Sequence, residues 1–208
     1  MFSAEPLSPV TSLAATRAPS DPLCDAAGSS TTPAVSGGGT LVIREGSTAD
    51  ASLLGRLHAT SWQMTYKGIM SDDFLASRVF AEREAHWQQK MRDWDPAHGD
   101  IRIAELDGEP IAFVTIVDDR EPQYGVYLDH LHVMPGHKGT GAGKRLIALA
   151  EQWARSRGAR QMYLLAWEAN LPARGFYEHL GWYCAEKFED ELVETRAMAC
   201  RYILKLEG

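Results

Sequence analysis

A run of glycines and cations at residues 131–145 has the composition of a phosphate-binding loop. Its glycines are Gly139, Gly141 and Gly143, and the cations beside them are Lys138, Lys144 and Arg145. Glycines let the backbone curl around an oxyanion so that several N–H groups point to one place. The helix expected to follow adds free N–H groups and the positive end of its dipole. The run therefore predicts a site for a phosphate or a pyrophosphate.

The spacing of these glycines does not fit two common nucleotide-binding motifs. A Walker A loop requires GxxxxGK[ST], but Arg145 follows Lys144 and no glycine lies at the required upstream position. A dinucleotide loop requires GxGxxG and an acidic ribose partner about 20 residues later, whereas this run is GxGxG without that partner. By itself the run leaves two alternatives open, a loop that binds a phosphate and a glycine-rich turn without a ligand.

The run resembles the acetyl-CoA pyrophosphate loop of GNAT acetyltransferases, which is written [RQ]xxGx[GA]. Residues 138–143, KGTGAG, match this pattern except that Lys138 replaces Arg or Gln, and residues 133–135 supply the V-x-P strand end that precedes the loop in the family. A second match lies downstream, where residues 170–182, NLPARGFYEHLGW, follow the family pattern NxxAxxFYxxxGF except for the last aromatic residue. Because the motifs have the family's order and spacing, the resemblance covers residues 41–206.

The resemblance implies that acetyl-CoA is the cosubstrate and that three parts of the chain bind it. The strand end would bond the pantetheine arm through its main chain, the loop would bind the pyrophosphate, and an asparagine would hold the arm. These residues are Leu131, His132 and Val133; Lys138, Gly139, Thr140, Gly141, Ala142, Gly143 and Lys144; and Asn170. Asn170 is equally suited to cap a helix, and the two roles are compatible.

A tyrosine in the second motif is the expected general acid. Transfer of an acetyl group from a thioester to an amine requires a neutral amine and a proton for the departing thiolate. In the family, a tyrosine at the position of Tyr177 supplies this proton, and it would contact the cofactor as well. A phenol with a pKa of ~10 suits an alkyl thiol leaving group. Without the family motif, Tyr177 would be interpreted as a core aromatic residue beside Phe176.

The general base is expected on the strand before the loop, where family members often place a carboxylate or a histidine. Strict alternation would put Tyr127, Asp129, Leu131 and Val133 on one face of this strand and two histidines on the other. We expect Asp129 to be the base, with His132 and His130 as alternatives. A surface carboxylate at Asp129 and a reaction without a base also remain possible.

Two segments are candidates for binding the acceptor. Residues 62–70 resemble the WxxxYxGI stretch of many family members, and Trp62 and Tyr66 lie on one helical face, where they line an acceptor pocket or belong to the core. An acidic cluster is expected in a loop between the last two strands, where it would attract a cationic amine or simply be solvated. Its members are Glu186, Glu189, Asp190, Glu191 and Glu194.

These features predict an N-acetyltransferase that transfers the acetyl group of acetyl-CoA to a primary amine of a small molecule. The alternatives are a protein or peptide N-acetyltransferase and a non-catalytic acyl-CoA-binding regulatory module with the same fold. The expected partners are acetyl-CoA and an amine acceptor, with a homodimer as a possibility. No metal is expected.

The elements that position these residues follow from hydrophobic periodicity. Strands are expected at 41–45, 101–106, 111–117, 127–134, 161–167, 182–188 and 197–206, and helices at 48–66, 71–77, 80–93, 141–157 and 173–181. Asp107-Gly108 between two strands indicates a hairpin. The order predicts an α/β (α+β) protein with a mixed sheet, and the resemblance implies the GNAT fold. Its central mixed, mostly antiparallel sheet of six to seven strands would be flanked by about four helices.

Composition limits the remaining choices for this chain of 208 residues. Residues 1–39, rich in Ser, Pro, Ala and Gly, are expected to be a disordered tail, and residues 40–208 the N-acetyltransferase domain. A net charge of −7 argues against nucleic acid as a partner, and no apolar run is long enough to span a membrane. Cys24, Cys184 and Cys200 show no metal-ligand spacing and are expected to be reduced thiols of a cytoplasmic protein.

Overall fold

The computed structural model describes residues 39–206, except for the side chain of Asp119, and contains one sheet of seven strands. The strands are β1 (Leu41–Glu45), β2 (Gly99–Leu106), β3 (Glu109–Glu121), β4 (Gly125–Val133), β5 (Gln161–Trp167), β6 (Tyr183–Leu192) and β7 (Thr195–Lys205). Their order is β1-β2-β3-β4-β5-β7-β6, and only β4 and β5 pair in parallel. The predicted mixed, mostly antiparallel sheet is therefore confirmed, whereas the predicted tail lies outside the described residues apart from Gly39.

The helices lie between these strands as the periodicity predicts, with one difference. They are α1 (Ala51–Thr65), α2 (Val79–Arg92), α3 (Ala142–Ser156) and α4 (Leu171–His179), with short 3-10 turns η1 (Thr48–Asp50) and η3 (Pro122–Tyr124). A π-helical segment, η2 (Phe74–Arg78), continues directly into α2. The two separate helices predicted at 71–77 and 80–93 are thus one helical run, since nothing between them breaks the backbone hydrogen bonding.

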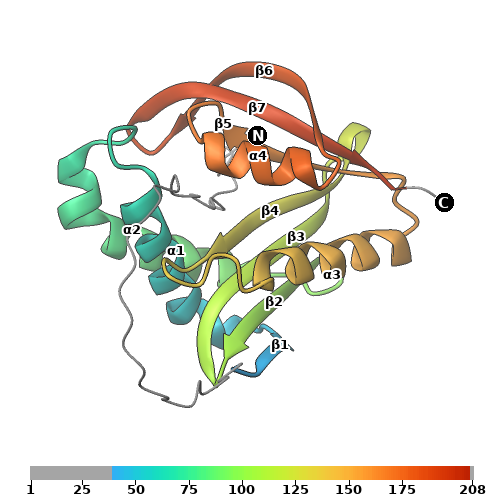
Figure 1. The fold of residues 1–208 in the computed structure, drawn as a ribbon, viewed down its shortest axis with the longest axis horizontal. Helices are drawn as coiled ribbons and strands as arrows, with labels where there is room; N and C mark the ends of the chain where they lie inside the picture. The colour runs from blue at the N-terminus through green and yellow to red at the C-terminus, as the bar shows by residue number, and fades with distance from the viewer. Residues whose placement is uncertain (1–38, 207–208) are drawn as a thin grey trace, which may run out of the picture.

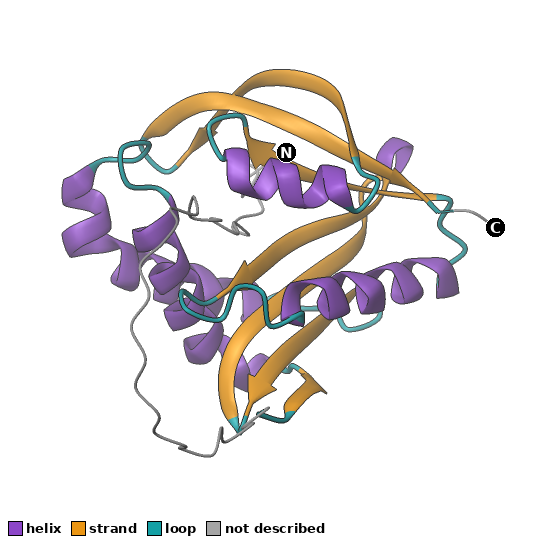
Figure 2. Cartoon of the chain, in the orientation of Figure 1, coloured by secondary structure: helices purple, strands orange, loops and turns teal. Residues whose placement is uncertain are grey.

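The helices cover both faces of the sheet (Figures 1 and 2). On one face, α3 and α4 bury Leu146, Ile147 and Tyr177 against the strands. On the other face, α1 and α2 bury Leu54 and Trp87 against β2 and β3. Successive side chains of a strand point to opposite faces of the sheet. Because helices cover both faces, consecutive residues of the central strands are buried.

The sheet opens between β4 and β5. These strands pair only through Val126 with Met162 and Tyr127 with Tyr163, and no register pair joins them beyond that point. In Figure 1, β1–β4 with α3 and β5–β7 with α4 form two halves that diverge. This gap in the backbone pairing separates the ends of β4 and β5, each of which leads into one of the two sequence motifs.

A β-bulge at Asp129 changes the faces of β4. His130 pairs with Thr115 and Leu128 pairs with Ile116, so Asp129 is an extra residue on β4. Leu128 and Leu131 consequently both belong to the core beneath α3. Asp129 and His130 both lie on the α1–α2 side, where Asp129 contacts Lys90 of α2. The predicted alternation, which placed Asp129 with Leu131 and Val133 and opposite the histidines, is therefore wrong.

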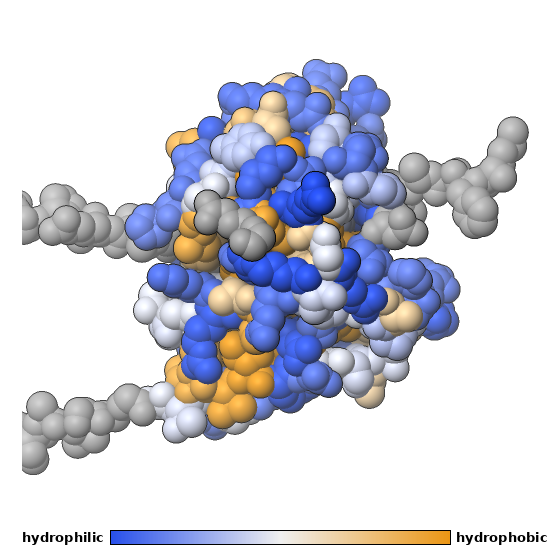
Figure 3. Space-filling model, turned by 90° about the vertical axis from the view of Figure 1, so that its right-hand side faces the viewer, coloured by the Kyte–Doolittle hydropathy of each residue, from blue (hydrophilic) through white to orange (hydrophobic). Residues whose placement is uncertain are grey.

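The acidic residues near the chain end do not form a loop. Four of the five, from Glu186 to Glu191, lie within β6 because this strand continues to Leu192 and pairs with β7. The Asp107-Gly108 hairpin is confirmed, with both residues in the left-handed region. The side of the molecule that lies on the right in Figure 1 is mostly hydrophilic, with separate hydrophobic areas (Figure 3). Among the helices of residues 39–206, none is long and apolar enough to cross a membrane.

Candidate active site

Both sequence motifs line one cavity of about 680 Å³ on the face that carries α3 and α4. One wall is the loop from His137 to Gly141 and the first turn of α3, and the other is the exposed side of α4. The predicted residues that line it are Val133, Lys138, Gly139, Thr140, Gly141, Ala142, Gly143 and Lys144. Leu171, Pro172 and Phe176 of α4 give the opposite wall an apolar character. The volume falls within the range of ligand sites, roughly 300–1,000 Å³.

The backbone of the loop is arranged to bind an anion. Gly139 and Gly141 have φ angles of 85° and 84°, in the left-handed region that favours glycine. In the described part of the chain, the N–H groups of Lys138, Gly139, Gly141, Gly143 and Lys144 donate to no backbone acceptor. Such a set of free donors at a helix N-terminus is suited to phosphate oxygens.

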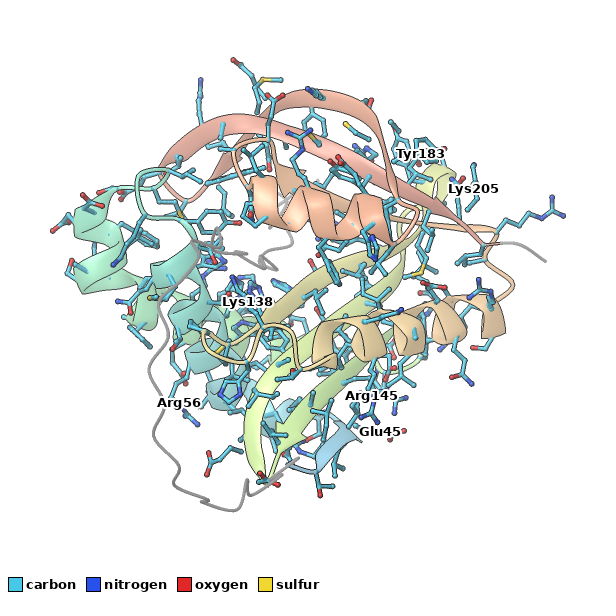
Figure 4. All side chains as sticks on the ribbon, viewed as in Figure 1. Glu45, Arg56, Lys138, Arg145, Tyr183 and Lys205 are labelled. Carbon is cyan, nitrogen blue, oxygen red and sulfur yellow. The ribbon has the colours of Figure 1, made fainter. Side chains whose placement is uncertain are left out.

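The cations near the loop have different surroundings. Lys138 lies on the loop between β4 and α3 (Figure 4), and partial burial lowers its pKa. Lys144 lines the cavity, whereas Arg145 donates to the carbonyl oxygen of Leu41 at 3.1 Å. Two of the three predicted cations therefore lie at the cavity, and Arg145 connects α3 to β1.

The predicted strand-end residues have buried side chains. Leu131 is fully buried beneath α3, and Val133 alone of the three lines the cavity. His132 lies on the opposite face, where its Nδ1 is 3.0 Å from the hydroxyl of Ser61. A role of the His132 side chain in the cavity is excluded by this orientation.

Asn170 caps α4 and still has a free donor. Its side-chain oxygen accepts from the N–H of Ala173 at 3.3 Å, which is the predicted N-cap interaction. Its Nδ2 is buried and has no hydrogen-bond partner among residues 39–206. An unpartnered buried amide is costly unless a ligand satisfies it, so the surroundings of Asn170 fit the expected contact with the cofactor arm.

Tyr177 and Tyr66 interact electrostatically, although they belong to opposite faces of the sheet. Tyr177 belongs to α4 and Tyr66 follows α1, and these helices cover opposite faces. Burial, and secondarily the phenol of Tyr66, raise the pKa of Tyr177 well above its ordinary value. The phenol of Tyr177 is therefore protonated at neutral pH, as a proton donor must be. Tyr66 also contacts Trp167 at the end of β5, with ring centroids 5.0 Å apart.

Trp62 lies deeper than Tyr66 in the same core. It is fully buried, its ring is 5.5 Å from that of Tyr66, and the guanidinium of Arg83 lies 4.3 Å above it. Trp62 and Tyr66 are thus both fully buried in this core, and neither lines the cavity beside α3 and α4.

Asp129 is ionised and held by cations. Lys90 Nζ lies 2.7 Å and Arg120 Nη1 lies 3.8 Å from its carboxylate, and His130 Nδ1 lies 3.0 Å away. Although burial opposes ionisation, these neighbours hold the pKa of Asp129 well below its ordinary value. A carboxylate with so low a pKa is a weak base, which disfavours Asp129 as the direct proton acceptor.

A second cavity, of about 380 Å³, opens on the α2 side of the sheet. Asp129 lines it together with His86 and Lys90 of α2 and Val117 and Arg120 of β3. Sequence patterns did not identify Lys90 and Arg120 as neighbours of Asp129. Lys90 is about 40 residues from Asp129 in the chain, and the bulge at Asp129 depends on the pairing of β4 with β3. In the described part of the chain, no group of His, Cys, Asp or Glu side chains is arranged to hold a metal ion.

Comparison with known proteins identifies the class. Residues 62–182 match the model of the acetyltransferase (GNAT) family, which is more than half of the chain. This protein therefore belongs to the acetyltransferase (GNAT) family, as its two motifs and its fold predict.

The chain is also similar to individual members. The uncharacterized N-acetyltransferase YobR of Bacillus subtilis is 25% identical over 122 residues, which cover 58% of this chain and 47% of that protein. N-acetyltransferase family 8 member 2 of Rattus norvegicus is 30% identical over 88 residues, which cover 41% of this chain and 39% of that protein. The chain thus spans less than half the length of these curated relatives. The PaiA N-acetyltransferase of Thermoplasma acidophilum, solved in complex with coenzyme A, has the same fold, with a TM-score of 0.65 and 19% identity over 80% of this chain and 99% of that chain.

Proposed function

We propose that this protein transfers the acetyl group of acetyl-CoA to a primary amine of a small molecule. The observation that carries the proposal is the convergence of both motifs on one cavity, with the protonated Tyr177 phenol buried on the same side of the sheet. Acetyl-CoA supplies an activated acetyl thioester. The chain supplies free N–H groups for the pyrophosphate, the unpartnered amide of Asn170 for the arm, and the Tyr177 proton for the departing thiolate.

The acceptor is proposed to reach the gap from the α1–α2 face. The cofactor cavity lies on the other face, beside the end of β4, and β4 and β5 have no register pair beyond Tyr127 and Tyr163. The cavity beside Asp129 has a volume of about 380 Å³, which suits a small molecule better than a folded protein surface. The PaiA enzyme in its complex with coenzyme A supports the cofactor assignment, since its fold matches over most of the chain.

The test combines binding with turnover. Thermal melting is measured with acetyl-CoA, longer acyl-CoAs, NAD and ATP, and thiol release from acetyl-CoA is followed with a panel of small amines and lysine peptides. A ligand at 100 times its Kd adds about 2.7 kcal/mol of stability, which raises Tm by roughly 5–10 °C in a domain of this size. Stabilisation by acetyl-CoA and amine-dependent thiol release from small amines are expected. Stabilisation by ATP or NAD alone would refute the proposal.

A further inference from the structure

The cavity of about 380 Å³ on the α2 side combines apolar surface with ionised groups. Trp94, which follows α2, and Val117 of β3 supply the apolar part. Three of the ionised groups form a chain of ion pairs: Lys90, Asp129 and Arg120. Their side chains are at most 29% exposed. Charges shielded from water in this way interact more strongly with a ligand than exposed charges do.

One positive charge in this group is not balanced, because two cations face the single carboxylate of Asp129. Lys90 Nζ holds that carboxylate at 2.7 Å, and His130 Nδ1 approaches it at 3.0 Å. Arg120 Nη1 lies farther away, at 3.8 Å, which is beyond hydrogen-bond distance. Lys90 therefore neutralises Asp129, and the charge of the Arg120 guanidinium is available to a ligand in the cavity.

The guanidinium of Arg120 has no hydrogen-bond acceptor in the described part of the chain, where neighbouring groups act on it only through their charges. The nearby carboxylate of Glu121 is engaged by Arg201 at 2.9 Å. Asp190 also acts on Arg120 through its charge, without a hydrogen bond between them. A partly buried guanidinium without an acceptor has lost hydration that nothing replaces. A ligand carboxylate would replace it with two parallel charge-assisted hydrogen bonds.

Arg120 lies beside the point where β4 and β5 separate. Its guanidinium is 5.1 Å from the centroid of the Tyr127 ring, and Tyr127 is the last residue of β4 that pairs with β5. The Tyr127 ring stacks on that of Tyr163 of β5, with centroids 4.7 Å apart. Asp129, which lines the same cavity, is two residues before Leu131, the first residue of the strand end that the family resemblance assigns to the pantetheine arm. A molecule bound to Arg120 is therefore held on the face from which the acceptor is proposed to arrive.

We propose that the acceptor carries a carboxylate besides its amine, as an amino acid does, and that Arg120 binds this carboxylate. The inference rests on the function proposed above and names its substrate class. A carboxylate matches both the single unbalanced charge and the planar fork of a guanidinium. A phosphate group carries up to about two negative charges, so one of them would stay uncompensated. Trp94 and Val117 supply apolar surface for the rest of the acceptor. The volume is near the lower end of the roughly 300–1,000 Å³ of ligand sites, which suits a single amino acid better than a peptide.

The acidic residues that line the cavity are less available to a cationic acceptor. Asp118 is held by His98 at 2.9 Å and by Arg157 at 3.7 Å. Asp93 and Asp95 are exposed, so water and salt screen their charges. The acidic residues of β6, which were predicted to attract a cationic amine, do not line this cavity. The arrangement of charges therefore favours an acceptor with a negative group over a diamine.

The test compares acceptors that differ only in the carboxylate. Thiol release from saturating acetyl-CoA is measured with L-amino acids, with their amides and with a simple alkyl diamine, and each rate is referred to the neutral form of the amine. The kcat/KM of the amino acids should exceed that of the amides at least about tenfold. Equal or higher values for the amides or the diamine would overturn the inference.

Arg120→Gln keeps a polar side chain and removes the charge. It should raise the KM for amino acids by roughly 10- to 100-fold, with kcat within about threefold of wild type, and it should leave the KM for the amides unchanged. Arg157→Gln is the matched control, because it removes the same charge near the same cavity without lining it. It should behave as wild type. A wild-type KM for amino acids in Arg120→Gln would contradict the assignment.

A binding measurement on the wild-type protein keeps the test decisive if Arg120→Gln does not fold. Titration calorimetry in the presence of coenzyme A compares the same amino acids with their amides, and the amino acids should bind at least about tenfold more tightly. Equal affinity, or no binding of either, would overturn the inference. Binding that prefers the amino acids, without thiol release from acetyl-CoA with any amine, would instead refute the proposed acetyltransferase function and retain the carboxylate site.

Discussion

The left-handed backbone of Gly141 predicts that alanine at this position weakens acetyl-CoA binding as well as the fold. Gly141 is the N-cap of α3, with a φ of 84°, and a Cβ added there meets no heavy atom within 4 Å. The cost of Gly141→Ala is therefore conformational rather than steric. The left-handed region costs an L-residue about 1–2 kcal/mol. The unliganded loop can relax to other backbone angles, and acetyl-CoA must then restore the strained ones.

The magnitude follows from this strain. A cost of about 1–2 kcal/mol corresponds to a factor of roughly 5–30 in an equilibrium constant, so the Kd of acetyl-CoA is expected to rise by up to that factor. A loss of about 1 kcal/mol lowers the Tm of a domain of this size by roughly 2–4 °C. Titration calorimetry gives the Kd, and thermal melting followed by circular dichroism gives the Tm.

Gly108→Ala is the matched control for this experiment. Gly108 has a φ of 86° and equally open surroundings, but it lies in the hairpin turn between β2 and β3 and does not line the cofactor cavity. It should lower Tm by a similar amount and leave the Kd unchanged. Equal acetyl-CoA affinity in the two alanine variants would refute the argument that the left-handed loop geometry serves cofactor binding.

Three further predictions concern the loop, the acid and the buried histidines. Gly143→Glu should abolish stabilisation by acetyl-CoA, since a carboxylate would occupy the anion site; a wild-type thermal shift in this variant would contradict the loop assignment. Tyr177→Phe should lower kcat about 100-fold or more with little change in the Kd of acetyl-CoA, and an unchanged kcat would remove Tyr177 from the chemistry. The neutral buried histidines should make the fold acid-sensitive. Because their pKa values are lower in the folded than in the unfolded protein, the unfolded state binds more protons below about pH 6.5, and each ring costs up to about 1.4 kcal/mol per pH unit there. These rings are His58, His130 and His132. Urea unfolding between pH 7.5 and pH 5 measures this loss, which should be smaller in His58→Asn.

Local sequence determined the strands, most of the helices and the cofactor loop. Strand β5 begins and ends at the predicted residues 161 and 167, and the Asp107-Gly108 turn adopts the predicted left-handed conformation. These features depend on neighbours in the sequence, namely side-chain alternation, turn chemistry and glycine at positive φ. The two motifs also contain the residues that line the cavity beside α3 and α4, but four residues predicted to bind the cofactor do not line it: Leu131, His132, Asn170 and Tyr177.

Tertiary structure decided how the catalytic candidates face one another. The bulge at Asp129 depends on the register between β3 and β4, so a strand considered alone could only be assigned regular alternation. The acidic residues of β6 joined a strand because β7 supplies their backbone partners. Tyr66 and Tyr177 interact electrostatically although they belong to cores on opposite faces of the sheet. Sequence spacing contains none of these relations, since each depends on chain segments that come together only when the sheet forms.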